Sequence, residues 1–176
     1  GNTNVDGYLM SKNSFDGNTL NAIDLHRGLT GQGVSLNTDL CNADNTGGAN
    51  NNLARPQVNY AFLTGSSLRV IGDSCSTGSF TLEVYKASSG SGDLGSDAVN
   101  AGEGLTYLGE LTGISSGSFD QSISVTGLNV GDEVTLIAQR TDAAGLGLVQ
   151  DTSEFSGNVI VDTDDKDWGD APDISA

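Results

Sequence analysis

Carboxylate side chains crowd the last part of the chain, where the sequence reads DTDDKDWGDAPD from residue 162 onward. Calcium takes six to eight oxygen ligands, and closely spaced carboxylates can supply them. In an extended strand Asp162 and Asp164 lie on one face, and a turn after Asp165 would bring Asp167 to the same ion. The run lacks the glycine and final glutamate of an EF-hand loop, so carbonyl groups, water or Asp142 would complete the shell. The alternative is a solvated acidic linker that charge repulsion extends.

Two loops contain further oxygen-rich side chains, and each is a further candidate calcium site. The polar stretch NTDLCNADNTGGANNN is longer than most structureless connections, and it offers Asp39 and Asp44 beside Asn37 and Asn42. Asx turns are the other interpretation of this stretch. The Gly- and Ser-rich stretch of residues 88–103 allows the sharp turns that a metal loop needs. A flexible loop is the alternative there, and its acidic residues are Asp93, Asp97 and Glu103.

Catalytic chemistry has few candidates in this sequence. His26 is the only histidine, Asp24 lies two residues before it, and no nucleophile motif such as GxSxG is present. One histidine and two distant cysteines do not match the ligand spacing of a zinc site. Glu154 is the best candidate for an acid–base role among the glutamates, but we favour a structural hydrogen bond near a strand start. The glycine-rich loops lack the lysine of a phosphate-binding loop, so we expect no enzymatic activity.

The charge balance excludes several classes of partner. The 176 residues include 7 basic and 23 acidic side chains, which give a net charge of −16. Nucleic acids and anionic membranes need clustered Lys and Arg, so we expect neither as a partner. No apolar run approaches the length of a membrane span. The chain opens with Gly1 and no signal peptide, so we expect a mature or excised piece of a secreted or cell-surface protein.

Cys41 and Cys75 are the only cysteines. Two free thiols are one interpretation, but secreted all-β domains commonly contain a disulfide, and we predict one here. It would close a loop of about 34 residues and contribute about 3 kcal/mol in the chain-entropy model.

The middle of the chain predicts an all-β fold. Short strands alternate with Gly, Asn and Asp in the segments QVNYAFLTG, SLRVIGDS, SFTLEVYKAS, LTYLGELTG, SFDQSISVTGL, DEVTLIAQRTD and SEFSGNVIVD. About seven strands at this spacing favour an antiparallel, immunoglobulin-like β-sandwich, with a β-barrel as the alternative. Period-two alternation predicts inward faces made of Phe80, Leu82 and Val84 in one strand and Val134, Leu136 and Ala138 in another.

We divide the chain into three parts. Residues 1–53 contain the apolar pulses GYLMSKNSF and NAIDL, which are typical of β-solenoid rungs and lead into the polar loop. One or two rungs alone are marginal, so they either pack on the next domain or are the remainder of a longer solenoid. Residues 54–162 form the β-sandwich, and residues 163–176 form an acidic linker and the start of another module.

Several phrases also resemble a known arrangement. NSFDGN, NAIDL and GANNNLARPQV are similar to the end of a right-handed β-helix in large bacterial secreted proteins. In those proteins an immunoglobulin-like sandwich follows, with phrases similar to GEGLTYLG and DTSEFSGNVIV, and the resemblance covers about residues 13–161. DWGDAPD is similar to the opening of another module in bacterial surface proteins. The resemblance implies an extracellular stalk or adhesin module without catalytic activity, although most of the β-helix is absent.

These observations predict a structural or adhesive module of an extracellular multidomain surface protein, stabilised by calcium and bound to neighbouring modules. A carbohydrate- or protein-binding module is the first alternative. Tyr85 has outward parity and would then belong to an aromatic platform, but we favour a role in covering the second face of the sheet. The second alternative is an extracellular filament in which the N-terminal segment adds a strand to a neighbouring copy. That hypothesis fails if residues 1–25 fold back on their own domain.

Overall fold

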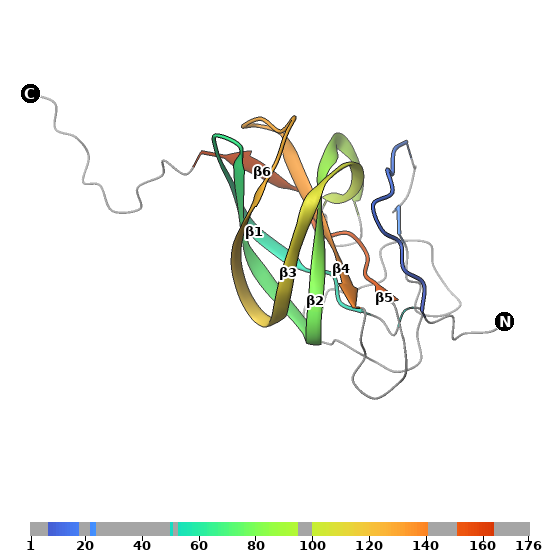
Figure 1. The fold of residues 1–176 in the computed structure, drawn as a ribbon. Helices are drawn as coiled ribbons and strands as arrows, with labels where there is room; N and C mark the ends of the chain where they lie inside the picture. Colours follow the sequence, from blue (N-terminus) through green and yellow to red (C-terminus); the bar gives the residue numbers. More distant parts are fainter. Residues whose placement is uncertain are drawn as a thin grey trace, which may run out of the picture.

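The computed structural model describes residues 7–17, 22–23, 50, 53–94, 100–140 and 151–163, with the backbone alone at residues 75–77, 89–94 and 100–101. This part of the chain is all-β, as predicted. Its strands form one sheet (Figure 1) and are β1 Gln57–Thr64, β2 Ser67–Leu94, β3 Asn100–Ser124, β4 Glu133–Arg140, β5 Asp151–Thr152 and β6 Val159–Asp162. None of the described residues belongs to a helix with the length and apolar character that a membrane span requires.

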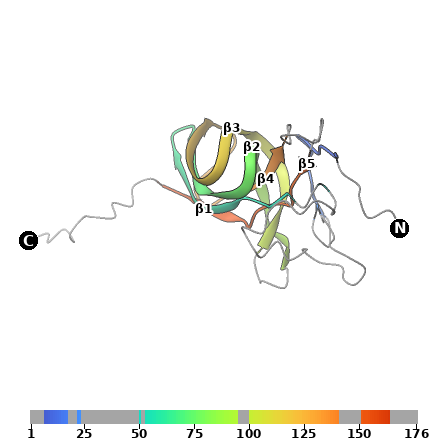
Figure 2. The same ribbon diagram turned by 90° about the horizontal axis from the view of Figure 1, so that it is seen from below.

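The sheet closes on itself instead of forming two packed layers. β2 pairs with β1 through its first half and with β4 through its second half, antiparallel in both cases. β6 lies between β1 and β4 and completes the ring, parallel to β1 and antiparallel to β4. β3 pairs along β2, and seen from below the two strands curve around the interior (Figure 2). The predicted sandwich is therefore wrong, and the alternative of a barrel is confirmed.

The unbroken length of β2 explains this difference. The sequence predicts two strands, SLRVIGDS and SFTLEVYKAS, yet both belong to a single strand of 28 residues. Its pairing with β3 is irregular between Ser74 and Ser79. Close to this irregularity, Gly78 (φ 107°) and Gly117 of β3 (φ 110°) adopt backbone conformations that favour glycine. A strand that bends in this way can pair with β1 at one end and with β4 at the other.

Apolar side chains from every long strand fill the interior of the barrel. Both predicted inward faces are confirmed, because all of their residues are buried in this core: Phe80, Leu82, Val84, Val134, Leu136 and Ala138. Phe119 of β3 joins them. Burial of each large side chain contributes roughly 1.5–3 kcal/mol of hydrophobic stabilisation, so this core is the main source of stability of the barrel.

A second, smaller apolar cluster lies on the outer face of β2 and β4. Tyr85 and Phe155 meet edge to face with ring centroids 5.6 Å apart, and Phe15 meets Phe155 in the same way at 5.3 Å. Tyr85 does point away from the barrel interior, as its parity predicts, but it is fully buried. Tyr85 therefore covers the second face of the sheet, as we favoured, and the alternative of an exposed platform is wrong because the N-terminal part of the chain lies over this face.

Residues 7–17 form that cover, and we name them the N-terminal segment. They run as an extended chain along one side of the barrel, drawn in blue at the right of Figure 1. No described residue before β1 belongs to a strand, so the predicted solenoid rungs are not formed in the described part of residues 1–53. The physical reason is that backbone groups of the N-terminal segment bond to the barrel, as described below, and not to a neighbouring rung.

Candidate functional site

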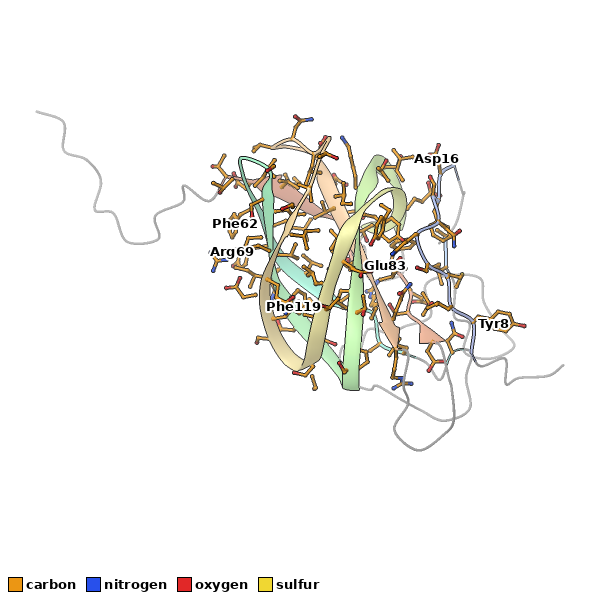
Figure 3. The ribbon with its side chains drawn as sticks, in the orientation of Figure 1. Tyr8, Asp16, Phe62, Arg69, Glu83 and Phe119 are labelled. Carbon is orange, nitrogen blue, oxygen red and sulfur yellow. The ribbon has the colours of Figure 1, made fainter. Side chains whose placement is uncertain are left out.

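Glu83 of β2 lies where the barrel meets the N-terminal segment (Figure 3). Its side chain is fully buried, and three donors surround the carboxyl group. Ser11 Oγ donates to Oε1 at 2.5 Å, and Lys12 N donates to Oε2 at 3.0 Å. The Tyr85 hydroxyl donates to the same Oε2. We name these four residues the Glu83 network.

The surroundings raise the pKa values of Tyr85 and Lys12. Burial raises the pKa of Tyr85, and its hydrogen bond to Glu83 raises that pKa further, so the phenol remains a donor. Lys12 Nζ lies 5.3 Å from the ring centroid of Tyr107 and 3.6 Å from Glu110 Oε2. Tyr107 and then Glu110 raise the pKa of Lys12, so its ammonium group remains charged.

Side chains of Asn50 and of the barrel also bind the backbone of the N-terminal segment at alternate residues. Asn50 is buried beside β5; its Oδ1 accepts from Tyr8 N and its Nδ2 donates to Tyr8 O, both at 3.1 Å. Met10 N donates to Thr152 Oγ1 at 2.9 Å, and Gln139 Nε2 donates to Met10 O at 2.8 Å. Alternate residues of an extended chain present their backbone groups to the same side, so one surface binds them all.

This arrangement is suited to holding a chain in place. Both carboxyl oxygens of Glu83 accept hydrogen bonds from within the protein. Over the described ranges, no three His, Cys, Asp or Glu side chains converge in a way that would hold a metal ion. The chemistry that the geometry supports here is recognition of an extended backbone.

The structure places only some of the predicted calcium ligands, and among the described side chains no three acidic, His or Cys groups converge on one point. Glu103 is buried in β3 and accepts a hydrogen bond from Gly17 N at 2.9 Å, so it binds the N-terminal segment. Asp162 ends β6, and its Oδ1 accepts from Thr163 N at 2.8 Å. Asp93 lies in β2, where only the backbone is described. The remaining predicted ligands lie outside the described residues: Asp39, Asp44, Asp97, Asp164, Asp165 and Asp167.

The other residues singled out from the sequence are only partly described. Cys41 lies outside the described residues and only the backbone of Cys75 is described, so the disulfide stays a prediction. His26 also lies outside them. Glu154 is buried next to Phe155, and its carbonyl oxygen accepts from Ser153 Oγ at 2.7 Å.

The opposite side of the barrel carries an aromatic pair that the sequence did not predict, with the Tyr60 ring exposed and the Phe62 ring buried. Tyr60 and Phe62 of β1 stack with ring centroids 5.9 Å apart and ring planes 9° apart. The strand registers place Ile160 of β6 beside Tyr60, and Arg69 of β2 opposite Phe62. Arg69 Nε and Nη2 donate to the carboxylate of Asp120 at 2.8 and 2.6 Å, which lowers the pKa of Asp120. We name these five residues the aromatic face.

Alternation in β1 is the signal that could have found this face. Ala61 and Leu63 point into the core, so Tyr60 and Phe62 must point outward. Phe62 is buried, but it belongs to neither apolar cluster. Figure 3 shows Phe62 and Arg69 on the side of the barrel away from Glu83.

A comparison with models of known protein families finds no match for this chain. The resemblance to a β-helix end and its following module therefore stays a prediction.

Proposed function

We propose that the chain is a structural module of an extracellular multidomain surface protein. The observation that supports this most is the fixed path of the chain through the module. It arrives along one side of the barrel, where the buried Glu83 network holds it, and β6 leaves from the other side (Figure 1). A module with a fixed entry and a distant exit sets the direction of its neighbours in a stalk.

The bonding of the N-terminal segment supports a rigid entry. Met10 and Phe15 pack against the outer apolar cluster, and backbone groups on either side of them are hydrogen-bonded to the barrel. Phe15 N donates to Gly104 O at 2.9 Å. The filament hypothesis required this segment to be free for a neighbouring copy. Residues 7–17 lie on their own barrel instead, so we favour the stalk module over the filament.

Spin labels can test the fixed entry directly. Leu9→Cys and Ile160→Cys place labels on exposed positions of the entry and of β6, in a Cys41→Ala/Cys75→Ala background whose unfolding is checked first. We expect a narrow distance distribution from double electron–electron resonance. Adding Glu83→Ala should broaden it, while Asp120→Ala should leave it unchanged. A broad distribution in the parent would exclude a rigid entry.

Calcium stabilisation remains part of the proposal through Asp162 and the acidic residues that follow it. A ligand that binds only the folded state raises stability by RT ln(1 + [L]/Kd), about 2.7 kcal/mol at a hundredfold excess over Kd. We expect millimolar calcium to raise the melting temperature and Asp162→Asn to reduce that rise. Equal melting temperatures with calcium and with chelator would remove calcium from the proposal.

The aromatic face favours glycan binding as a second candidate function. Tyr60 and Ile160 are 46% and 62% exposed, and the neighbouring Arg69–Asp120 pair offers hydrogen-bonding groups beside the ring. An exposed ring beside polar groups suits a sugar, and the acidic surroundings favour a neutral one. We expect the protein to bind an array of neutral glycans. Loss of this binding in Tyr60→Ala but not in Tyr8→Ala would support this candidate. Equal glycan binding by Tyr60→Ala and Tyr8→Ala would exclude the aromatic face as a glycan site.

A further inference from the structure

The first and last strands of the barrel, β1 and the four-residue β6, are parallel neighbours. β1 opens the barrel and β6 closes it, with Ala61 paired to Val161 and Phe62 paired to Asp162. Tension on the chain pulls the start of β1 and the end of β6 apart. Because the strands are parallel, this pull slides them along each other and loads their hydrogen bonds together. Antiparallel terminal strands would instead separate one bond at a time.

β6 is also fixed on the edge that faces away from β1. Gly131 N donates to Val161 O, and Val161 N donates to Asp132 O, both at 2.8 Å. Asp132 is itself held by Lys86 Nζ and Asn129 N, each at 2.7 Å, and these hydrogen bonds lower its pKa. The side chain of Val161 is fully buried in the barrel core. β6 therefore cannot slide without breaking contacts on both edges.

The N-terminal segment lies before β1 in the path of the tension. Side chains of Asn50 and of the barrel bind it at Tyr8, Met10 and Lys12, and in the described part of this contact one backbone–backbone bond, from Phe15 N to Gly104 O, joins it to β3. These bonds lie at separate points along the segment, so they can break in succession from its beginning. The segment should therefore yield at a lower force than the β1–β6 pair.

We propose that the chain resists tension in two stages. The N-terminal segment is released first and lengthens the chain while the barrel stays folded. The β1–β6 pair then acts as a mechanical clamp loaded in shear. This inference rests on the proposed function, since only a module within a longer chain is placed under tension.

Single-molecule force spectroscopy on the full chain, with handles at its two ends, tests the inference. The thiols are kept reduced, because a Cys41–Cys75 disulfide would carry the force past β1. We expect an early event that lengthens the chain by no more than about 50 residues, or ~170 Å. A later event at higher force should release about 105 residues, or ~350 Å. One event that releases the whole chain would overturn the two-stage order.

Moving one handle separates shear from peeling. The end of β1 and the end of β6 lie at the same end of the parallel pair, so a handle at Ser66→Cys, in the Cys41→Ala/Cys75→Ala background, peels the pair open. Forced unfolding is governed by the unfolding rate along the direction of pull. We expect the force of the later event to be lower with the Ser66→Cys handle than with handles at the two ends, by about twofold or more. Equal forces in both directions would overturn the clamp.

Two variants assign the events to the two elements. Glu83→Gln should lower the force of the first event and leave that of the second unchanged. Asp132→Asn should leave the force of the first event unchanged and lower that of the second. Failure of the proposed function gives a different result. If the N-terminal segment is not held on the barrel, the spin-label distance distribution is broad and the first force event is missing, while the second event persists. If Asp132→Asn leaves the second force unchanged, the bracing of β6 is wrong.

Discussion

The two halves of β2 carry polar side chains on the outside of the barrel. Those of the first half are exposed to water, and those of the second half are buried. Arg69 and Asp120 form an ion pair whose side chains are 42% and 49% exposed. Glu83 and Tyr85 are fully buried beneath the N-terminal segment. Water and salt screen an exposed pair, so it contributes little to stability. A buried carboxyl group that loses its donors keeps its desolvation cost, so breaking the buried network should cost far more.

One covering element makes the difference between these regions. Both lie on the paired strands β2 and β3, but residues 7–17 cover only the Glu83 side. The open side exposes Tyr60 and keeps its polar groups in contact with water. The covered side is suited to fixing the chain, and the open side to contact with another molecule. Four substitutions can break or sharpen this contrast.

Glu83→Ala should give the largest effect. It leaves the Ser11 hydroxyl, the Lys12 amide and the Tyr85 hydroxyl without their shared acceptor in a buried site. We expect the free energy of unfolding in urea to fall by about 3–5 kcal/mol, because each buried donor left without an acceptor costs about 1–3 kcal/mol. The matched variant Asp120→Ala should cost less than about 1 kcal/mol. Equal losses would remove the distinction between the two regions.

Gly104→Ala should rank second. A Cβ at this position would lie 2.8 Å from ring atoms of both Tyr85 and Phe155, which are buried and cannot easily move. Overpacking of this kind costs about 1–3 kcal/mol. Thr106→Ala, on an exposed position of the same strand, provides the control in the same urea titration. An unchanged midpoint for Gly104→Ala would mean that the outer cluster is loosely packed.

Tyr85→Phe should rank third, because it removes one donor to Glu83 and keeps the ring in the outer cluster. The expected loss is about 1–2 kcal/mol by thermal or urea unfolding. Tyr60→Phe removes the same hydroxyl from an exposed ring and should be nearly neutral. A larger loss for Tyr60→Phe than for Tyr85→Phe would reverse the assignment of the two faces.

Asp120→Asn should give the smallest effect, and the effect should depend on pH. Arg69 lowers the pKa of Asp120 in the folded protein, so the pair stabilises the fold above the unfolded pKa of about 3.9. This contribution is lost as the pH falls through the lower, folded pKa. The difference in unfolding free energy between wild type and Asp120→Asn should be well under about 1 kcal/mol at pH 7. It should vanish in strong acid, and a difference that grows there would contradict the ion pair.

Local alternation predicted which side of each strand faces the core. Leu82, Val84 and Leu136 have the predicted positions because period-two patterning depends only on neighbouring residues. The barrel itself depends on a long-range pairing, β6 with both β1 and β4, that no local pattern records. The glycine-rich middle of β2 has the composition of a turn, and only the pairing with β3 makes it a strand.

The candidate site was predicted less well, for a related reason. The parity of Tyr85 was right, but its burial depends on residues 7–17, far away in the sequence and without a regular pattern. Glu83 and Asn50 gave no local signal, because their roles come from the backbone groups that reach them. Glu103 was singled out as a calcium ligand for its carboxylate, and in the structure that carboxylate accepts from Gly17 N.

Hydrogen exchange of individual backbone amides tests most directly whether the N-terminal segment is locked onto the barrel. Met10 N and Lys12 N donate to Thr152 and Glu83, so both should exchange far more slowly than in an unstructured peptide. Glu83→Ala should speed exchange at Lys12 while the amide of Leu136 in β4 stays protected. Exchange of Met10 and Lys12 at unstructured rates in the wild-type protein would contradict the account.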